Sequence, residues 1–170
     1  RPVRVRTNPN KEALNNQVWD DSETIYWHLD GEFEHISQRK SRQIMKMSFI
    51  TPSMETPLTI RERRRSTSDA QIQIKILPKK DERYFTSDSI LAFAYGPGRY
   101  NGGDCTFNKD VLWLLRDQPL YADEAKELGY IENYHDRTNK IKYFDPVHTA
   151  IHEVGGHSLG MRHIESHKDQ

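Results

Sequence analysis

The segment of residues 70–78, AQIQIKILP, alternates strictly between apolar and polar residues as far as Ile76. Its isoleucines, Ile72, Ile74 and Ile76, are two positions apart, and successive side chains of a β-strand point to opposite faces of a sheet. The alternation therefore predicts a strand with one buried face. Such a strand needs neighbouring strands and a layer that covers its apolar face.

Further strands and helices are expected around this strand. The strands are predicted at residues 24–29, 57–65, 90–96 and 103–108. Apolar residues at helical spacing predict one helix over residues 32–49, ending before Thr51-Pro52, and a shorter one over residues 122–129. Asp145 as N-cap and Pro146 at the first helical position start a final helix. This order predicts one α+β domain with a mixed sheet.

The length and charge of the chain restrict its class. Its 170 residues fit one domain, with residues 1–18 expected as a loose arm and residues 19–170 as the folded unit. The 25 basic and 25 acidic residues balance, which argues against a nucleic-acid partner. No apolar run approaches the roughly 20 residues of a membrane span, and no signal peptide is recognised. A single cysteine, Cys105, permits no internal disulfide.

The richest stretch for chemistry is HEVGGHSLGMRH, residues 152–163. In the motif HExxH two histidines on one helix face bind zinc, and the glutamate acts as general base on the zinc-bound water. Here His152 and His157 are five positions apart, so a regular helix would turn them about 140° away from each other rather than about 40°. A π-bulge at Gly155-Gly156 would bring both to one face.

Two other outcomes are open for this stretch. The insertion could splay the histidines and weaken or abolish zinc binding. Alternatively, His148 and His152, four positions apart, could chelate a metal, although no glutamate then follows the first histidine.

Several segments in the same order resemble the matrixins, the matrix metalloproteinase family of the metzincins. The segments are TIYWHL after Trp19, TPLTIRE, SDAQIQIKI, LAFAYGPGRYNGGDCTFNKDVLW and the histidine stretch. Together they cover residues 19–113 and 147–164. The resemblance implies a metzincin-like α+β fold, in which a twisted, mostly parallel five-stranded mixed sheet carries a backing helix and an active-site helix.

The resemblance also implies roles for single residues. His152, His157 and His163 would be zinc ligands, and Glu153 the general base. Ala92, Phe93, Ala94 and Tyr95 would form the sheet edge along which a substrate strand adds. Asp104 resembles a calcium ligand of the family.

At several positions the sequence differs from the family pattern, and these differences predict which metal sites and turns are absent. The positions of the family's structural-zinc histidines hold Lys79, Phe93 and Thr106, so no structural zinc is expected. Asn108 and Val111 stand where the family has acidic calcium ligands, so at least one calcium site is expected to be lost. The family's methionine turn has no counterpart, so the domain is expected to be truncated before it.

The sequence therefore predicts a zinc-dependent endopeptidase that cleaves extended protein substrates. The alternative is an inactive matrixin-like protein that binds an extended polypeptide by strand addition. The family resemblance further implies an extracellular protein, and a monomer without a membrane span or nucleic-acid partner is expected.

Overall fold

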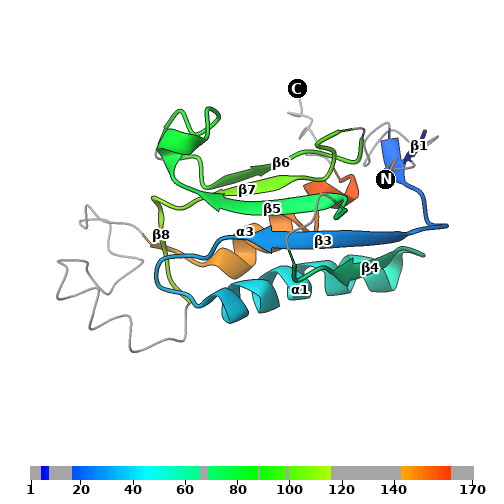
Figure 1. Cartoon of the computed structure of the whole chain (residues 1–170), viewed down its shortest axis with the longest axis horizontal. Helices are drawn as coiled ribbons and strands as arrows, with labels where there is room; N and C mark the ends of the chain where they lie inside the picture. The colour runs from blue at the N-terminus through cyan, green and yellow to red at the C-terminus, as the bar shows by residue number, and fades with distance from the viewer. Residues whose placement is uncertain are drawn as a thin grey trace, which may run out of the picture.

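The computed structural model describes residues 5–7, 17–65, 69–87, 89–98, 100–115 and 143–161. Its centre is a five-stranded sheet with the strand order β4-β3-β5-β7-β6 (Figure 1). The strands in chain order are β3 (Thr24–Asp30), β4 (Thr59–Glu62), β5 (Ile72–Leu77), β6 (Ala92–Ala94) and β7 (Cys105–Asn108). All five expected strands are therefore present.

The sheet is mostly parallel, with one antiparallel edge. β3 runs parallel to both β4 and β5, and β5 runs parallel to β7. β6 pairs with β7 in the antiparallel direction, with Ala92 opposite Phe107 and Ala94 opposite Cys105. The predicted α+β architecture with a mostly parallel five-stranded mixed sheet is confirmed.

The first helix, α1 (Gln38–Glu55), crosses from β3 to β4 and begins and ends later than expected. It starts after Ser37, whose hydroxyl accepts a hydrogen bond from the Lys40 N–H as an N-cap. Phe33 and Ile36 are buried in the turn before the helix, so their apolar character reflects packing of that turn. At the other end, the helix continues through Pro52, and the prediction that it stops before Thr51-Pro52 is wrong.

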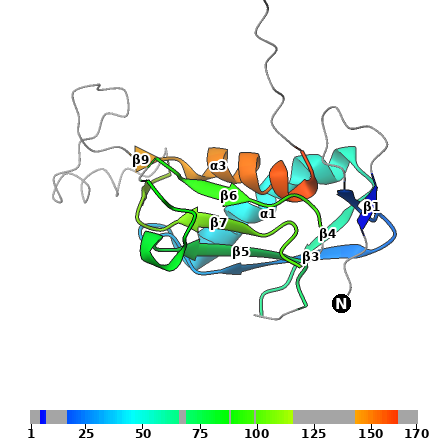
Figure 2. The ribbon, with the colours of Figure 1, turned by 90° about the horizontal axis from the view of Figure 1, so that it is seen from above.

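The last helix, α3 (Pro146–Glu153), begins as predicted. The Asp145 carboxylate accepts a hydrogen bond from the Val147 N–H, and Pro146 occupies the first turn, where its missing N–H costs nothing. α3 packs against α1 and contacts β6. Figure 2 shows both helices on the same side of the sheet, with α3 alongside β6.

The hydrophobic core lies between this sheet face and the two helices. Ile72, Ile74 and Ile76 of β5 are at most 4% exposed and belong to the core cluster, as their alternation predicts. From the helices, Ile44, Met45 and Phe49 of α1 and Ala150 of α3 join it. The site-bearing helix is therefore fixed on the core side of the sheet.

Smaller elements complete the described part of the chain. β1 (Val5–Thr7) and β2 (Gln17–Trp19) form an antiparallel pair, so these parts of the expected loose arm are structured. β8 (Leu112–Trp113) and β9 (Tyr143–Phe144) form a short parallel pair, and η1 (Lys79–Asp81) is a 3-10 turn. The helix expected at residues 122–129 lies outside the described residues. Within the described residues, no helix is both long and apolar enough to cross a membrane.

Candidate metal centre

The candidate ligands lie where α3 ends. His152 and Glu153 are the last two residues of α3, and His157 is the first residue of the 3-10 helix η2 (His157–Leu159). Val154, Gly155 and Gly156 form the turn between the two helices. This turn decides whether the histidines meet.

The extra residue of HEVGGH is accommodated by a change of helix type. The N–H groups of Val154 and Gly155 both donate to the Ala150 carbonyl, at 2.8 and 3.2 Å, and the second bond spans five residues as in a π-turn. The α-helix then ends, and the chain continues into η2. The expected π-bulge inside a continuing helix is therefore replaced by a single π-type bond at a helix end.

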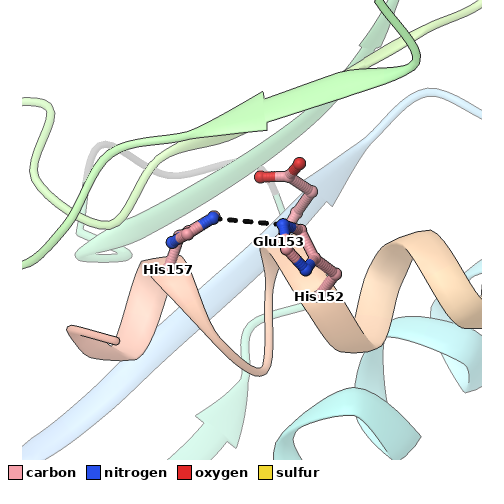
Figure 3. Close-up of side chains that lie close together, drawn as sticks. All are labelled: His152, Glu153 and His157. Atoms are coloured by element: carbon pink, nitrogen blue, oxygen red, sulfur yellow. Dashed lines mark hydrogen bonds between the residues drawn. The ribbon is translucent and has the colours of Figure 1, made fainter. Parts of the chain in front are cut away.

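This turn places the two imidazoles face to edge. Their Nε2 atoms are 3.2 Å apart, and the ring planes are nearly perpendicular at 89° (Figure 3). Two nitrogens bound tetrahedrally to one zinc, each about 2.0–2.1 Å from the metal, are about 3.4 Å apart. The spacing of His152 and His157 therefore fits one zinc ion. The two histidines are not splayed apart.

The proton position on His157 suits a metal ligand. Its Nδ1 lies 2.8 Å from the Met161 carbonyl oxygen, which can only accept, so Nδ1 carries the proton in the neutral ring. That tautomer leaves a lone pair on Nε2, the atom that faces His152. Met161 thus supports the site through its backbone, which no side-chain pattern in the sequence could reveal.

Glu153 completes the group of three possible ligands. Its carboxylate and the ring nitrogens of both histidines lie within 4.8 Å of one another (Figure 3). Partial burial raises the pKa of Glu153 to about 7 in the metal-free protein. The nearby Cys105 thiol is fully buried, and its pKa is raised by burial and by the Glu153 carboxylate. Cys105 is therefore a core residue, whereas Glu153 can exchange a proton near neutral pH.

Two further histidines were candidates in the sequence. His148 is exposed and does not belong to the group formed by His152, Glu153 and His157. His163, the expected third zinc ligand, lies outside the described residues.

Asp104 has a structural partner. One of its carboxylate oxygens accepts a hydrogen bond of 2.9 Å from the Gln73 N–H, which connects the loop before β7 to β5. Burial raises the pKa of Asp104 to about 6, against the lowering effects of this hydrogen bond and of Lys75. Among the described residues, only His152, Glu153 and His157 form a group of three or more possible metal ligands.

The expected substrate edge coincides with β6 and the residue after it. The N–H and C=O of Tyr95 bond to Asp104 and Gly103, and the Leu91 C=O bonds to Asn108. Because backbone groups alternate in direction along a strand, Phe93 also faces β7, whereas Ala92 and Ala94 direct their backbone groups to the outer edge.

The side chain of Phe93 belongs to an aromatic cluster that the sequence analysis missed. Its ring contacts those of Tyr84, Phe85 and Tyr95 at centroid distances of 5.1 to 5.9 Å. These contacts join the loop before β6 to the outer face of the strand. Aromatic residues on both sides of the predicted strand were the available signal.

Comparisons with known proteins agree with this geometry. The family model described as Matrixin matches residues 18–169, which is nearly the whole chain. A search of curated proteins found no significant match.

Proposed function

Because the chain belongs to the matrixin family, we propose that it is a zinc-dependent endopeptidase that hydrolyses extended polypeptides. The observation that carries this proposal is the 3.2 Å separation of the His152 and His157 Nε2 atoms, despite the additional glycine between them. If the insertion had moved these two nitrogen atoms apart, they could not both bind the same metal ion.

In this proposal His152 and His157 hold the zinc through Nε2, with His163 as the third ligand. Bound zinc would polarise the scissile carbonyl and make water a stronger nucleophile at neutral pH. The Met161 carbonyl keeps the Nδ1 proton on His157, so the Nε2 lone pair can bind the metal.

Glu153 is the proposed general base. It takes a proton from the attacking water and later passes it to the leaving amine. Without metal, partial burial raises the pKa of Glu153 to about 7. A bound cation would lower this pKa and favour the ionised base.

The substrate is proposed to add as an antiparallel strand along β6. Within the expected edge Ala92–Tyr95, Ala92 and Ala94 would make the backbone hydrogen bonds, because Phe93 and Tyr95 direct theirs toward β7. α3 contacts β6, so a strand at this edge would pass close to Glu153.

The family also supports three weaker parts of the proposal. Matrixins are typically extracellular, and we propose the same for this chain, acting as a monomer. We propose Asp104 as a calcium ligand, together with carbonyl groups of its loop. No structural zinc is proposed, since Phe93 and Thr106 supply no ligand for one.

The test compares the parent chain with Glu153→Gln. We expect the parent to bind zinc and to cleave an unstructured protein, and a chelator to stop cleavage. Glu153→Gln should lose about 10²- to 10⁴-fold in kcat while still binding zinc, because it removes the base and no histidine. Glu34→Gln, which changes an exposed glutamate, is the matched control.

Two results would contradict the proposal. A Glu153→Gln variant that cleaves as fast as the parent would exclude Glu153 as the base. A parent that takes up no zinc when it is supplied would refute the enzyme, and binding of an extended polypeptide without cleavage would then favour the inactive alternative.

A further inference from the structure

The inserted turn rests directly on the other helix. A Cβ atom at Gly155 would lie 2.4 Å from the carbonyl oxygen of Ser48 in α1 and 2.8 Å from that of Ile151. Both distances are too short for any side chain. The backbone of Gly155 therefore lies against the Ser48 carbonyl, in a contact that only glycine permits.

The two glycines of the turn are needed for different reasons. A Cβ at Gly156 would lie 2.3 Å from the carbonyl of His152, which belongs to the same turn. A Cβ at Gly155 would instead collide with a separate helix. Gly156 thus allows the turn to pass close to the end of α3, whereas Gly155 allows it to pack against α1.

The Ser48 carbonyl is available because of Pro52. In an α-helix the carbonyl of Ser48 would accept from the N–H four residues later, but that residue is proline and has no N–H. The proline ring also pushes against this carbonyl and turns it away from the helix axis. Pro52 therefore directs the Ser48 oxygen toward Gly155.

Little else fills the space on this side of the turn. A cavity of about 530 Å³ adjoins the contact and is lined by Ser48, Pro52 and Gly155, with Ile151, Leu159 and Met161 around them. Since this cavity leaves room beside the turn, the contact with Ser48 limits how closely the turn approaches α1.

We propose that Ser48 and Pro52 of α1 position the metal ligands by holding Gly155 at a fixed distance. Neither residue would touch the metal or the substrate. Gly155 lies two residues after Glu153 and two before His157, so a displacement here changes the distance between the two imidazoles. The inference rests on the proposed zinc function, but it concerns how the unusual insertion is tolerated.

The test is a cycle of Gly155→Ala, Pro52→Ala and the double variant in the full chain. Gly155→Ala should lower zinc affinity by about tenfold or more, as is typical when the groups that orient metal ligands are disturbed. Pro52→Ala alone should also lower zinc affinity, by less than Gly155→Ala, because the Ser48 carbonyl returns to the helix and no longer holds the turn, while glycine at position 155 adds no collision. In the double variant the new N–H at position 52 draws the Ser48 carbonyl back into the helix and makes room for the added methyl group on that side. Part of the affinity should therefore return, and the remaining loss reflects the Ile151 carbonyl, 2.8 Å from the added Cβ.

Two readouts separate positioning from general stability. The visible spectrum of the Co²⁺-loaded chain reports ligand geometry and should change in Gly155→Ala and return in the double variant. Without metal, the nuclear Overhauser effect between the His152 and His157 rings should be lost in Gly155→Ala and should return in the double variant. Ile44→Val, a change in the α1 core, is the control and should lower the urea midpoint of unfolding without altering either readout.

Each result decides the inference separately from the proposed function. If Gly155→Ala keeps the parent's ring contact and zinc affinity, or if the double variant recovers neither, the positioning role is refuted. If Gly155→Ala does not fold, a double variant that folds and restores the ring contact supports it, and one that also fails to fold refutes it. A parent without zinc or cleavage refutes the proposed function, while the ring contact still tests the positioning role.

Discussion

Replacing Asp104 by asparagine should make the protein more stable at neutral pH. In the folded chain the carboxylate is partly buried beside β5, and burial raises its pKa from 3.8 to about 6. Asparagine keeps the side-chain oxygen that accepts the Gln73 N–H but carries no charge to desolvate.

The size of the gain follows from the pKa difference. A rise from 3.8 to about 6 corresponds to about 3 kcal/mol at a pH above both values, because each pKa unit is worth about 1.4 kcal/mol. Solvent screens a carboxylate that is only partly buried, so we expect a gain of about 1 to 2 kcal/mol.

The sign of the pH dependence is fixed by the same values. A carboxyl group with a raised pKa binds its proton more tightly in the folded state, so its destabilising effect is absent below about pH 4 and grows as the pH rises through about 6. The difference between Asp104→Asn and the parent should therefore be largest at about pH 7.5 and shrink toward pH 4.

Urea unfolding with a chelator present, followed by tryptophan fluorescence across this pH range, measures the difference. Asp110→Asn is the matched control, because the exposed Asp110 carboxylate likewise accepts a backbone N–H, that of Lys79. The control should show no gain. If Asp104→Asn is no more stable than the parent at about pH 7.5, burial of this charge does not destabilise the folded chain.

Further variants test other contacts. Trp19→Phe should cost about 1 to 3 kcal/mol in urea unfolding, because it leaves the buried Ser158 carbonyl without its 2.8 Å donor; an unchanged midpoint would contradict this. Gly103→Ala should cost more than Gly31→Ala: both glycines have a positive φ, but an added Cβ lies 2.6 Å from the Trp19 ring at Gly103 and no closer than 3.1 Å to any atom at Gly31. Equal losses of stability in the two variants would show that the positive φ, and not the close contact, determines the cost. If Asp104 binds calcium, added calcium should raise the melting temperature of the parent and leave that of Asp104→Asn unchanged.

The sheet could be predicted from the sequence because its signals are local. Strict alternation in residues 70–76 marks β5, and Asp145-Pro146 marks the start of α3. The limits of α1 were wrong for a physical reason. Phe33 and Ile36 continue the apolar spacing of the helix but are buried in the preceding turn, and Pro52 in the final turns removes only one helical hydrogen bond.

The site was harder to predict than the fold. The sequence identifies His152, Glu153 and His157, but a helical wheel separates the two histidines. Their approach depends on the bond from Gly155 to Ala150 and on the carbonyls of Ser48 and Met161, which are backbone groups. Backbone contacts between distant segments leave no mark on residue type except the glycine that they require.

The hydrogen bond from the Trp19 indole to the Ser158 carbonyl joins residues that are 139 positions apart. On the ribosome, Trp19 is made long before the turn that carries the histidines, so the turn gains this anchor only once nearly all the described chain has been made. A partly synthesised chain, or a fragment cut between these residues, lacks the anchored turn. The position of the histidine-bearing segment therefore depends on both ends of the described chain being present together.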